Sequence, residues 1–172
     1  MKELILYYSR AAENYFGGSL KYIEKGNTEV VAEKLAALTG GTLFHVEPVT
    51  PYSDDYNTCI DQAKKDLRSN ARPAVKEMPD NTEQYDLITV MYPNYWGTMP
   101  MHMFTVLEQI DFKGKTVRAI CTHEGSGMGR SESDLKKICS SAEFKKGLAI
   151  QGSSVSRCDE TLEKWNESIS TY

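Results

Sequence analysis

Short apolar runs and segments of helical spacing alternate along the chain. The first run is Leu4 to Tyr8, and after a polar stretch the apolar positions Val31, Leu35 and Leu38 recur at the spacing of one helix face. The run 87–92 is almost wholly apolar, which is typical of a strand buried on both faces of a parallel sheet. Strand and helix alternate in this way five times, which predicts an α/β fold with a parallel sheet.

The remaining elements follow the same pattern. Further strands are expected at 42–46, 116–121 and, with a weaker pattern, 144–150. Helices are expected near 28–38, 56–67, 100–107, 131–138 and 159–169. The first helix should end at Gly40-Gly41, and a capping box of Ser131 and Asp134 should open the fourth.

Three loops are unusual, and they follow the first, third and fourth strands. The first carries an insertion at 11–24 that places aromatic residues beside two glycines, and the others are 93–100 and 122–129. In parallel sheets, ligands bind beyond the carboxyl ends of the strands, so all three loops should meet at one edge. The insertion is either a hairpin-like excursion over the site or a surface insertion, and its aromatics favour the first interpretation.

The junction before the first helix suits an anion. A helix that starts after Lys25-Gly26-Asn27-Thr28 presents unpaired backbone N–H groups and the positive end of its dipole, which together favour a phosphate. The alternative for Asn27 and Thr28 is an ordinary N-cap. The neighbouring loops favour phosphate binding.

With these loops the chain resembles a bacterial flavodoxin, a small carrier of flavin mononucleotide (FMN). The resemblance covers nearly the whole chain, and its most specific parts are Tyr8-Ser9-Arg10 with 26–29, Tyr85-Asp86, the loop 93–100, and 112–115. It implies a three-layer sandwich with a five-stranded parallel sheet in the order 2-1-3-4-5, the order for which flavodoxin is the standard example. It also implies one FMN-binding domain over 1–172.

The resemblance implies that the first loop holds the FMN phosphate through Ser9, Asn27 and Thr28, with Gly26 allowing close approach of the backbone. Arg10 departs from the family, which binds this dianion with neutral donors. It either contacts the phosphate or points to solvent.

In the second loop, Pro93 to Gly97, the family places an aromatic residue against the flavin. Trp96 is the candidate and Tyr95 its rival, with a Trp that fills a loop core as the alternative. Asn94 offers its amide to the flavin edge, and Gly97 allows the peptide to change orientation.

The third loop departs most, because many flavodoxins place a Tyr there. This chain has His123, Glu124, Gly125, Ser126 and Gly127 instead. The second face of the flavin is therefore expected to be open, or covered by His123 or by Tyr15-Phe16. Backbone N–H groups of the glycine-serine segment would bond the pyrimidine carbonyls; a flexible turn and a surface histidine are the alternatives.

The function implied is electron transfer between redox partner proteins, a reductase and an acceptor. An NAD(P)H-dependent FMN or quinone reductase on the same fold is the alternative. No catalytic residue is assigned, since the sequence holds no Ser-His-Asp, HExxH or Walker pattern. A cofactor-free receiver-like domain is disfavoured, because Tyr8-Ser9 and Tyr92-Pro93 stand where receivers need acidic residues.

Net charge and cysteine content argue against two further classes of protein, nucleic-acid binders and metal-binding proteins. A net charge of -4 and the lack of a Lys/Arg cluster argue against a nucleic-acid binder. The four cysteines form no CxxC pair and no metal-type spacing with histidines, so we expect reduced thiols and no metal. With no basic-then-apolar leader and no membrane-length run, the expectation is a cytoplasmic monomer without membrane contact.

Overall fold

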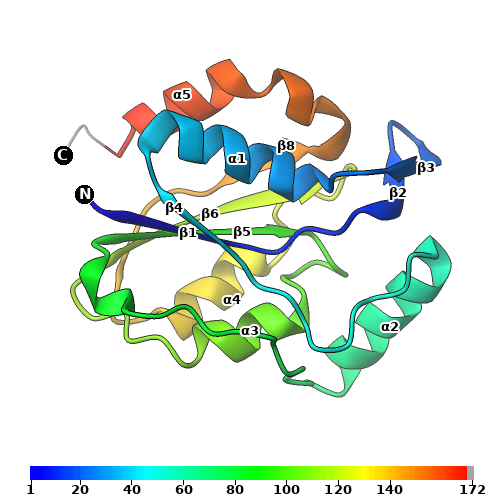
Figure 1. The fold of residues 1–172 in the computed structure, drawn as a ribbon, viewed down its shortest axis with the longest axis horizontal. Coiled ribbons are helices and arrows are strands. Elements are labelled where there is room, and N and C mark those ends of the chain that lie inside the picture. Colours follow the sequence, from blue (N-terminus) through cyan, green and yellow to red (C-terminus); the bar gives the residue numbers. More distant parts are fainter. Residues whose placement is uncertain (170–172) are drawn as a thin grey trace.

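A parallel sheet forms the middle layer of the structure, a computed structural model in which residues 1–169 are described (Figure 1). Its strand order is β4-β1-β5-β6-β7, and β8 also pairs with β6. All of these pairs are parallel. The strands are β1 (Glu3–Tyr7), β4 (Thr42–His45), β5 (Leu87–Pro93), β6 (Thr116–His123), β7 (Glu143–Phe144) and β8 (Leu148–Gln151). When the strands of this path are numbered by their order along the chain, the sequence across the sheet is 2-1-3-4-5, so the predicted order is confirmed.

The fifth position of the sheet differs from the prediction, because two short strands occupy it instead of one strand over 144–150. β7 and β8 pair with the two halves of β6. Between them the Lys146 carbonyl accepts a hydrogen bond from the Trp165 indole at 2.9 Å instead of from a strand. The sheet ladder is therefore interrupted at this point.

Helices cover both faces of the sheet (Figure 1). One face carries α1 (Asn27–Thr39) and α5 (Asp159–Glu167), and the other carries α2 (Tyr56–Arg68), α3 (Met101–Leu107) and α4 (Ser131–Ile138). Short 3₁₀ helices occur at η1 (Thr82–Gln84) and η2 (Gly152–Arg157). Each face has its own apolar cluster, which accounts for the continuous apolar runs in the central strands. Within residues 1–169, every helix is too short or too polar to cross a bilayer.

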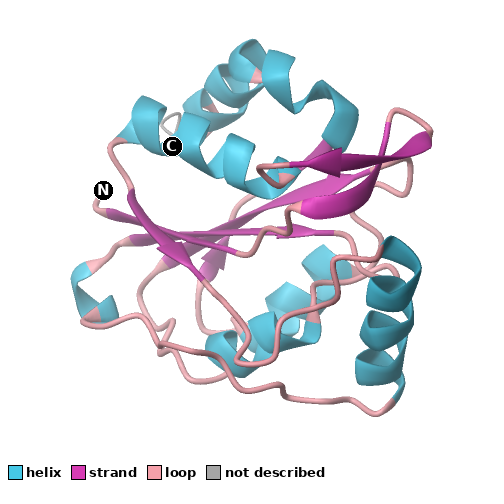
Figure 2. Cartoon of the chain, turned by 45° about the vertical axis from the view of Figure 1, so that its right-hand side comes forward, coloured by secondary structure: helices cyan, strands magenta, loops and turns pink. Residues whose placement is uncertain are grey.

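The insertion forms an antiparallel hairpin of β2 (Ala12–Phe16) and β3 (Ser19–Ile23), which stands at the carboxyl edge of the sheet (Figure 2). Gly17 and Gly18 make its two-residue turn with φ of 67° and 90°, a conformation that glycine adopts without steric cost. The prediction that the insertion forms a hairpin is therefore confirmed.

The predicted capping box at α4 is wrong. The N-cap is Arg130 without a side-chain cap, and Ser131 is the first helical residue. The Ser131 hydroxyl is buried, where it donates to the Met128 carbonyl at 2.6 Å and is 2.9 Å from the Tyr92 hydroxyl. Asp134 instead accepts from the Thr98 hydroxyl at 2.6 Å. Both side chains are used by tertiary contacts that local spacing does not reveal.

Candidate functional site

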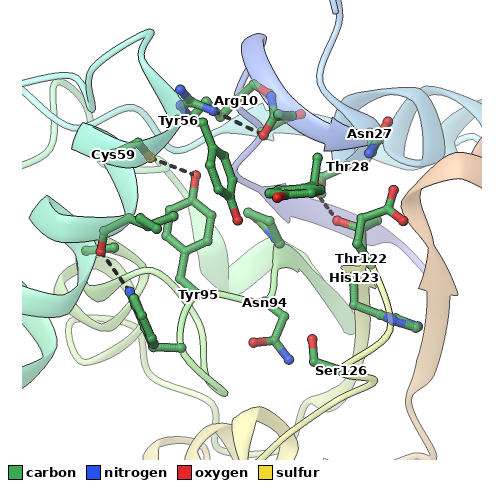
Figure 3. A pocket seen from close by; sticks show the side chains of 18 of the residues that line it. Arg10, Asn27, Thr28, Tyr56, Cys59, Asn94, Tyr95, Thr122, His123 and Ser126 are labelled. Atoms are coloured by element: carbon green, nitrogen blue, oxygen red, sulfur yellow. Dashed lines mark hydrogen bonds between the residues drawn. The ribbon is translucent and has the colours of Figure 1, made fainter. Parts of the chain in front are cut away.

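A cavity of about 640 Å³ lies where the loops after β1, β5 and β6 meet the hairpin and α2. This volume suits a small-molecule cofactor. Figure 3 shows side chains from α1, α2 and these loops around it. The cavity is lined by Ser9, Arg10, Asn14, Tyr15, Gly18, Asn27, Thr28, Tyr56, Cys59, Ile60, Ala63, Pro93, Asn94, Tyr95, Trp96, Gly97, Thr122, His123, Glu124 and Ser126.

The cavity brings together most of the residues predicted for the site. Outside its lining are three glycines: Gly26, Gly125 and Gly127. The lining also contains residues that were not predicted: Asn14 and Gly18 of the hairpin, Thr122 at the end of β6, and Tyr56, Cys59, Ile60 and Ala63 of α2. The α2 residues carried no sequence signal, because their spacing is that of an ordinary buried helix face.

The N-terminus of α1 forms one end of the cavity. Gly26 is the N-cap and provides no side chain, and the backbone N–H groups of Asn27 and Thr28 have no acceptor among residues 1–169. The Ser9 hydroxyl, twenty positions earlier, accepts from the Glu29 N–H at 2.9 Å. The Thr28 hydroxyl lies 2.8 Å from that of Thr122 (Figure 3). Two free N–H groups and several hydroxyls at a helix N-terminus form a neutral donor set for an anion.

Gly26 is required here by close approach and not by its own backbone angles, since its φ is -62°. A Cβ at this position would lie 2.1 Å from the Ser9 Oγ and 2.7 Å from the Arg10 carbonyl oxygen. Any larger residue would therefore displace the loop that follows β1.

Arg10 lines the cavity, but its donors are used by the protein. Its guanidinium donates to the Ser53 carbonyl at 2.7 and 3.1 Å, to the Asp54 carbonyl at 2.9 Å and to the Asn14 Oδ1 at 3.1 Å. Arg10 thus connects the hairpin to the segment before α2. No carboxylate within residues 1–169 forms an ion pair with it, so its positive charge remains available to an anion at the cavity wall.

The second loop turns tightly at Trp96 and Gly97. Tyr95 and Thr98 exchange two backbone hydrogen bonds, and φ is 56° at Trp96 and 88° at Gly97, as in a type I′ turn. The left-handed conformation costs a non-glycine residue about 1–2 kcal/mol. Such strain concentrates at functional sites. The Trp96 indole N–H donates to the Ile60 carbonyl at 2.8 Å, and the Lys64 Nζ lies 4.9 Å from the ring centroid.

Asn94 connects the second and third loops. Its Nδ2 donates to the Gly127 carbonyl at 2.9 Å, and its Oδ1 accepts from the Gly97 N–H at 2.8 Å. The Arg130 N–H donates to the Gly97 carbonyl at 2.7 Å. The Asn94 amide, which we predicted to contact the flavin edge, is thus engaged in holding the two loops together.

Tyr95 lines the cavity, and its ring also packs against an aromatic cluster. Its ring meets those of Tyr8 and Tyr52 edge-on, with centroids 6.2 and 5.5 Å away. Burial raises the pKa of the Tyr95 hydroxyl well above its usual value and also raises the pKa of the Cys59 thiol, which lies 3.9 Å away. Both groups are therefore protonated at neutral pH, and Cys59 is not an activated nucleophile.

The third loop forms the polar side of the cavity. The His123 Nδ1 accepts from the Gly125 N–H at 2.9 Å, so this N–H is already bonded within the protein. The N–H groups of Ser126 and Gly127 have no acceptor among the described residues. Of the three N–H groups predicted to meet a ligand, two are free to do so.

The parallel sheet, its strand order and a cavity at the point where that order reverses define a flavodoxin-like α/β protein. The sequence profile of the family described as Flavodoxin matches residues 18–169, and the chain belongs to this family.

Several solved structures share the fold. A candidate flavoprotein from Bacteroides eggerthii DSM 20697 is 28% identical over 99% of both chains, with a TM-score of 0.80. Another from Bacteroides uniformis ATCC 8492 is 24% identical over 96% of this chain and 97% of that chain, with a TM-score of 0.75. A flavoprotein from Lactobacillus acidophilus NCFM, solved in complex with FMN, is 21% identical over 96% and 98%, with a TM-score of 0.68. No curated protein sequence matches the chain significantly.

Proposed function

We propose that the protein binds FMN in this cavity and acts as an electron carrier. The observation that carries the proposal is the convergence of the loops after β1, β5 and β6 and the α1 N-terminus on one cavity of about 640 Å³. The family assignment and the FMN complex of the Lactobacillus acidophilus relative support the choice of nucleotide.

The donor set fits FMN. The free N–H groups of Asn27 and Thr28 and the hydroxyls of Ser9 and Thr28 would hold the phosphate, and the Arg10 charge at the wall would add attraction. Trp96, Tyr95 and the α2 residues provide an apolar surface for the isoalloxazine ring, with the N–H groups of the third loop on the other side. A cavity of this kind, mostly apolar with a few placed donors, is typical of cofactor sites.

When bound, FMN supplies the ability to take up and release electrons. The chain's own residues would then bind the nucleotide, exclude water from one side of the ring and fix the second and third loops through Asn94. We further propose a cytoplasmic monomer that exchanges electrons with a reductase and an acceptor protein. The four unpaired cysteines are consistent with a reducing compartment.

The test is to add FMN to the purified protein and measure binding by flavin absorbance and fluorescence, then to reduce the complex anaerobically by light. Saturable one-to-one binding and transfer of the electrons to a haem protein are expected. A protein that is colourless as purified and does not change the absorbance or fluorescence of added FMN would contradict the proposal.

A quinone or FMN reductase that uses NAD(P)H is the second candidate. The observation that favours it is the third loop, which lines the cavity with His123, Glu124 and Ser126 and offers no Tyr to cover a flavin from that side. A nicotinamide or quinone could approach there. Rapid, sustained oxidation of NADPH by the FMN-loaded protein with a quinone would favour the reductase over the carrier.

Thr28→Ala is expected to weaken FMN binding about tenfold while changing riboflavin affinity little, because the lost hydroxyl bonds a charged phosphate that riboflavin lacks. Thr39→Ala, at the opposite end of the same helix, is the matched control and should leave both affinities unchanged. Titration of flavin fluorescence measures each. An equal loss for FMN and riboflavin would remove Thr28 from the phosphate site.

Trp96→Ala is expected to weaken FMN binding about tenfold through loss of aromatic contact with the ring. Trp96→Phe keeps an aromatic ring but loses the hydrogen bond to the Ile60 carbonyl, so it should retain most of the affinity. Both affinities are measured by the same titration. Wild-type affinity in Trp96→Ala would show that the indole does not contact the flavin.

A further inference from the structure

Two tyrosines line one side of the cavity, one from the insertion in the first loop and one from a helix. Tyr15 comes from the hairpin and Tyr56 from the first turn of α2. Their ring centroids are 5.0 Å apart and their planes are inclined by 74°, an edge-to-face contact. Figure 3 shows Tyr56 reaching toward the middle of the cavity on the same side as Tyr95, while the third loop lies opposite.

The two rings are held as one unit. The Glu13 carboxylate accepts from the Tyr56 backbone N–H at 3.1 Å, and the Glu13 N–H donates to the Asp54 carbonyl at 3.2 Å. Arg10 adds its hydrogen bonds between the hairpin and the segment before α2. The hairpin therefore fixes the start of α2, and with it the direction of the Tyr56 side chain.

The Tyr56 hydroxyl has no hydrogen-bond partner within residues 1–169, although its ring is partly buried. Burial raises the pKa of this phenol, so it is a neutral donor at physiological pH. A neutral aromatic ring with a free hydroxyl, aimed into a cofactor cavity, is suited to a planar heteroaromatic ligand.

We propose that Tyr56 packs directly against the isoalloxazine ring of FMN and that Tyr15 supports Tyr56 from behind. This assignment rests on the proposed function, because it requires FMN in the cavity. It gives the hairpin insertion a role, which is to position an aromatic residue of α2. It also adds an aromatic residue of α2 on the side of Tyr95, opposite the third loop.

The test compares Tyr56→Leu with Tyr56→Phe in the full chain. Tyr56→Leu is expected to bind FMN about tenfold more weakly, and its bound flavin should fluoresce more brightly because a quenching ring is lost. Tyr56→Phe should keep the affinity and the quenching. Tyr22→Leu is the matched control, since Tyr22 lies on the same face of the hairpin as Tyr15 but is 74% exposed and does not line the cavity.

Wild-type affinity and quenching in Tyr56→Leu would overturn the assignment while leaving FMN binding intact. Failure of the unaltered protein to bind FMN would instead overturn the proposed function. Nuclear magnetic resonance of ¹³C-labelled tyrosine in the unaltered protein gives a test independent of the folding of Tyr56→Leu. The Tyr56 ring signals, assigned with Tyr56→Phe, should shift on FMN addition, and signals that stay in place would also overturn the assignment.

Discussion

Arg118→Met is expected to lower the free energy of unfolding by about 3–5 kcal/mol, because it leaves a buried carboxylate without its partner. Arg118 and Glu3 lie in the sheet with only 1% and 5% of their surfaces exposed. The guanidinium donates to the Glu3 Oε1 and to the Thr89 hydroxyl, both at 2.9 Å, and its carbon lies 4.2 Å from the Trp165 ring centroid. Urea unfolding at pH 7 measures the change.

Two variants separate this effect from simple loss of an ion pair. The double variant Glu3→Leu/Arg118→Met removes both charges and should recover most of the stability, since apolar replacement of a buried pair is often neutral. Lys164→Met removes the exposed pair with Glu160 in α5, which contributes at most about 1 kcal/mol. A loss in Arg118→Met as small as that in Lys164→Met would show that water reaches the Glu3 carboxylate.

The order of elements could be predicted because each depends on a local pattern. The continuous apolar run of β5 and the spacing of Val31 and Leu35 in α1 give the type of each element directly. Gly40, with φ of 74°, ends α1 as its residue type predicts. The break between β7 and β8 could not be predicted, because it depends on a contact with Trp165, eighteen or more residues away.

The part of the site formed by loops at the carboxyl edge of the sheet could be predicted from the sequence. The loops after β1, β5 and β6 meet because parallel strands end on the same side, so Thr28, Trp96 and Ser126 line one cavity. Sequence spacing alone does not indicate which hydrogen bonds the polar side chains of these loops form. Asn94 bonds two loops and Ser9 caps a helix twenty residues away, and both arrangements arise only after the strands are paired.

The contribution of α2 to the site could not be predicted from sequence spacing either. Tyr56 is the first residue of α2, the helix that follows β4. Because β4 is at the edge of the sheet, α2 is not connected along the chain to any of the three loops that carry the family resemblance. It reaches the cavity because the hairpin bonds to the start of α2 through Glu13 and Arg10. An insertion that looks independent in the sequence thus changes which helix contributes to the site.

Lowering the pH from 7 to 4 is expected to destabilise the protein by about 3 kcal/mol through His102 alone. This residue of α3 is fully buried, its Nε2 lies 3.1 Å from the Val46 carbonyl oxygen, and its Nδ1 has no partner among the described residues. Burial lowers its pKa from 6.5 to about 4. A proton on Nδ1 would create a buried, charged N–H for which the described residues offer no acceptor.

Acidification destabilises the folded protein because the unfolded chain binds a proton at His102 more readily than the folded protein does. Above pH 6.5 the ring is neutral in both states, and between pH 6.5 and about 4 the unfolded chain binds a proton that the folded protein excludes. Stability present at neutral pH is therefore lost progressively over this interval as the pH falls. Carboxylates add their own dependence at the lower end, so the informative quantity is a difference between variants.

His102→Gln keeps a donor for the Val46 carbonyl but does not titrate. It should be less stable than the wild type at pH 7 and lose less of that stability on acidification. His45→Gln should remove a smaller part of the pH dependence, since burial also lowers the pKa of His45 but its ring is partly exposed. Urea unfolding at half-unit steps from pH 7 to 4 measures all three proteins. Parallel curves for the wild type and His102→Gln would mean that His102 takes up its proton as readily in the folded protein as in the unfolded chain.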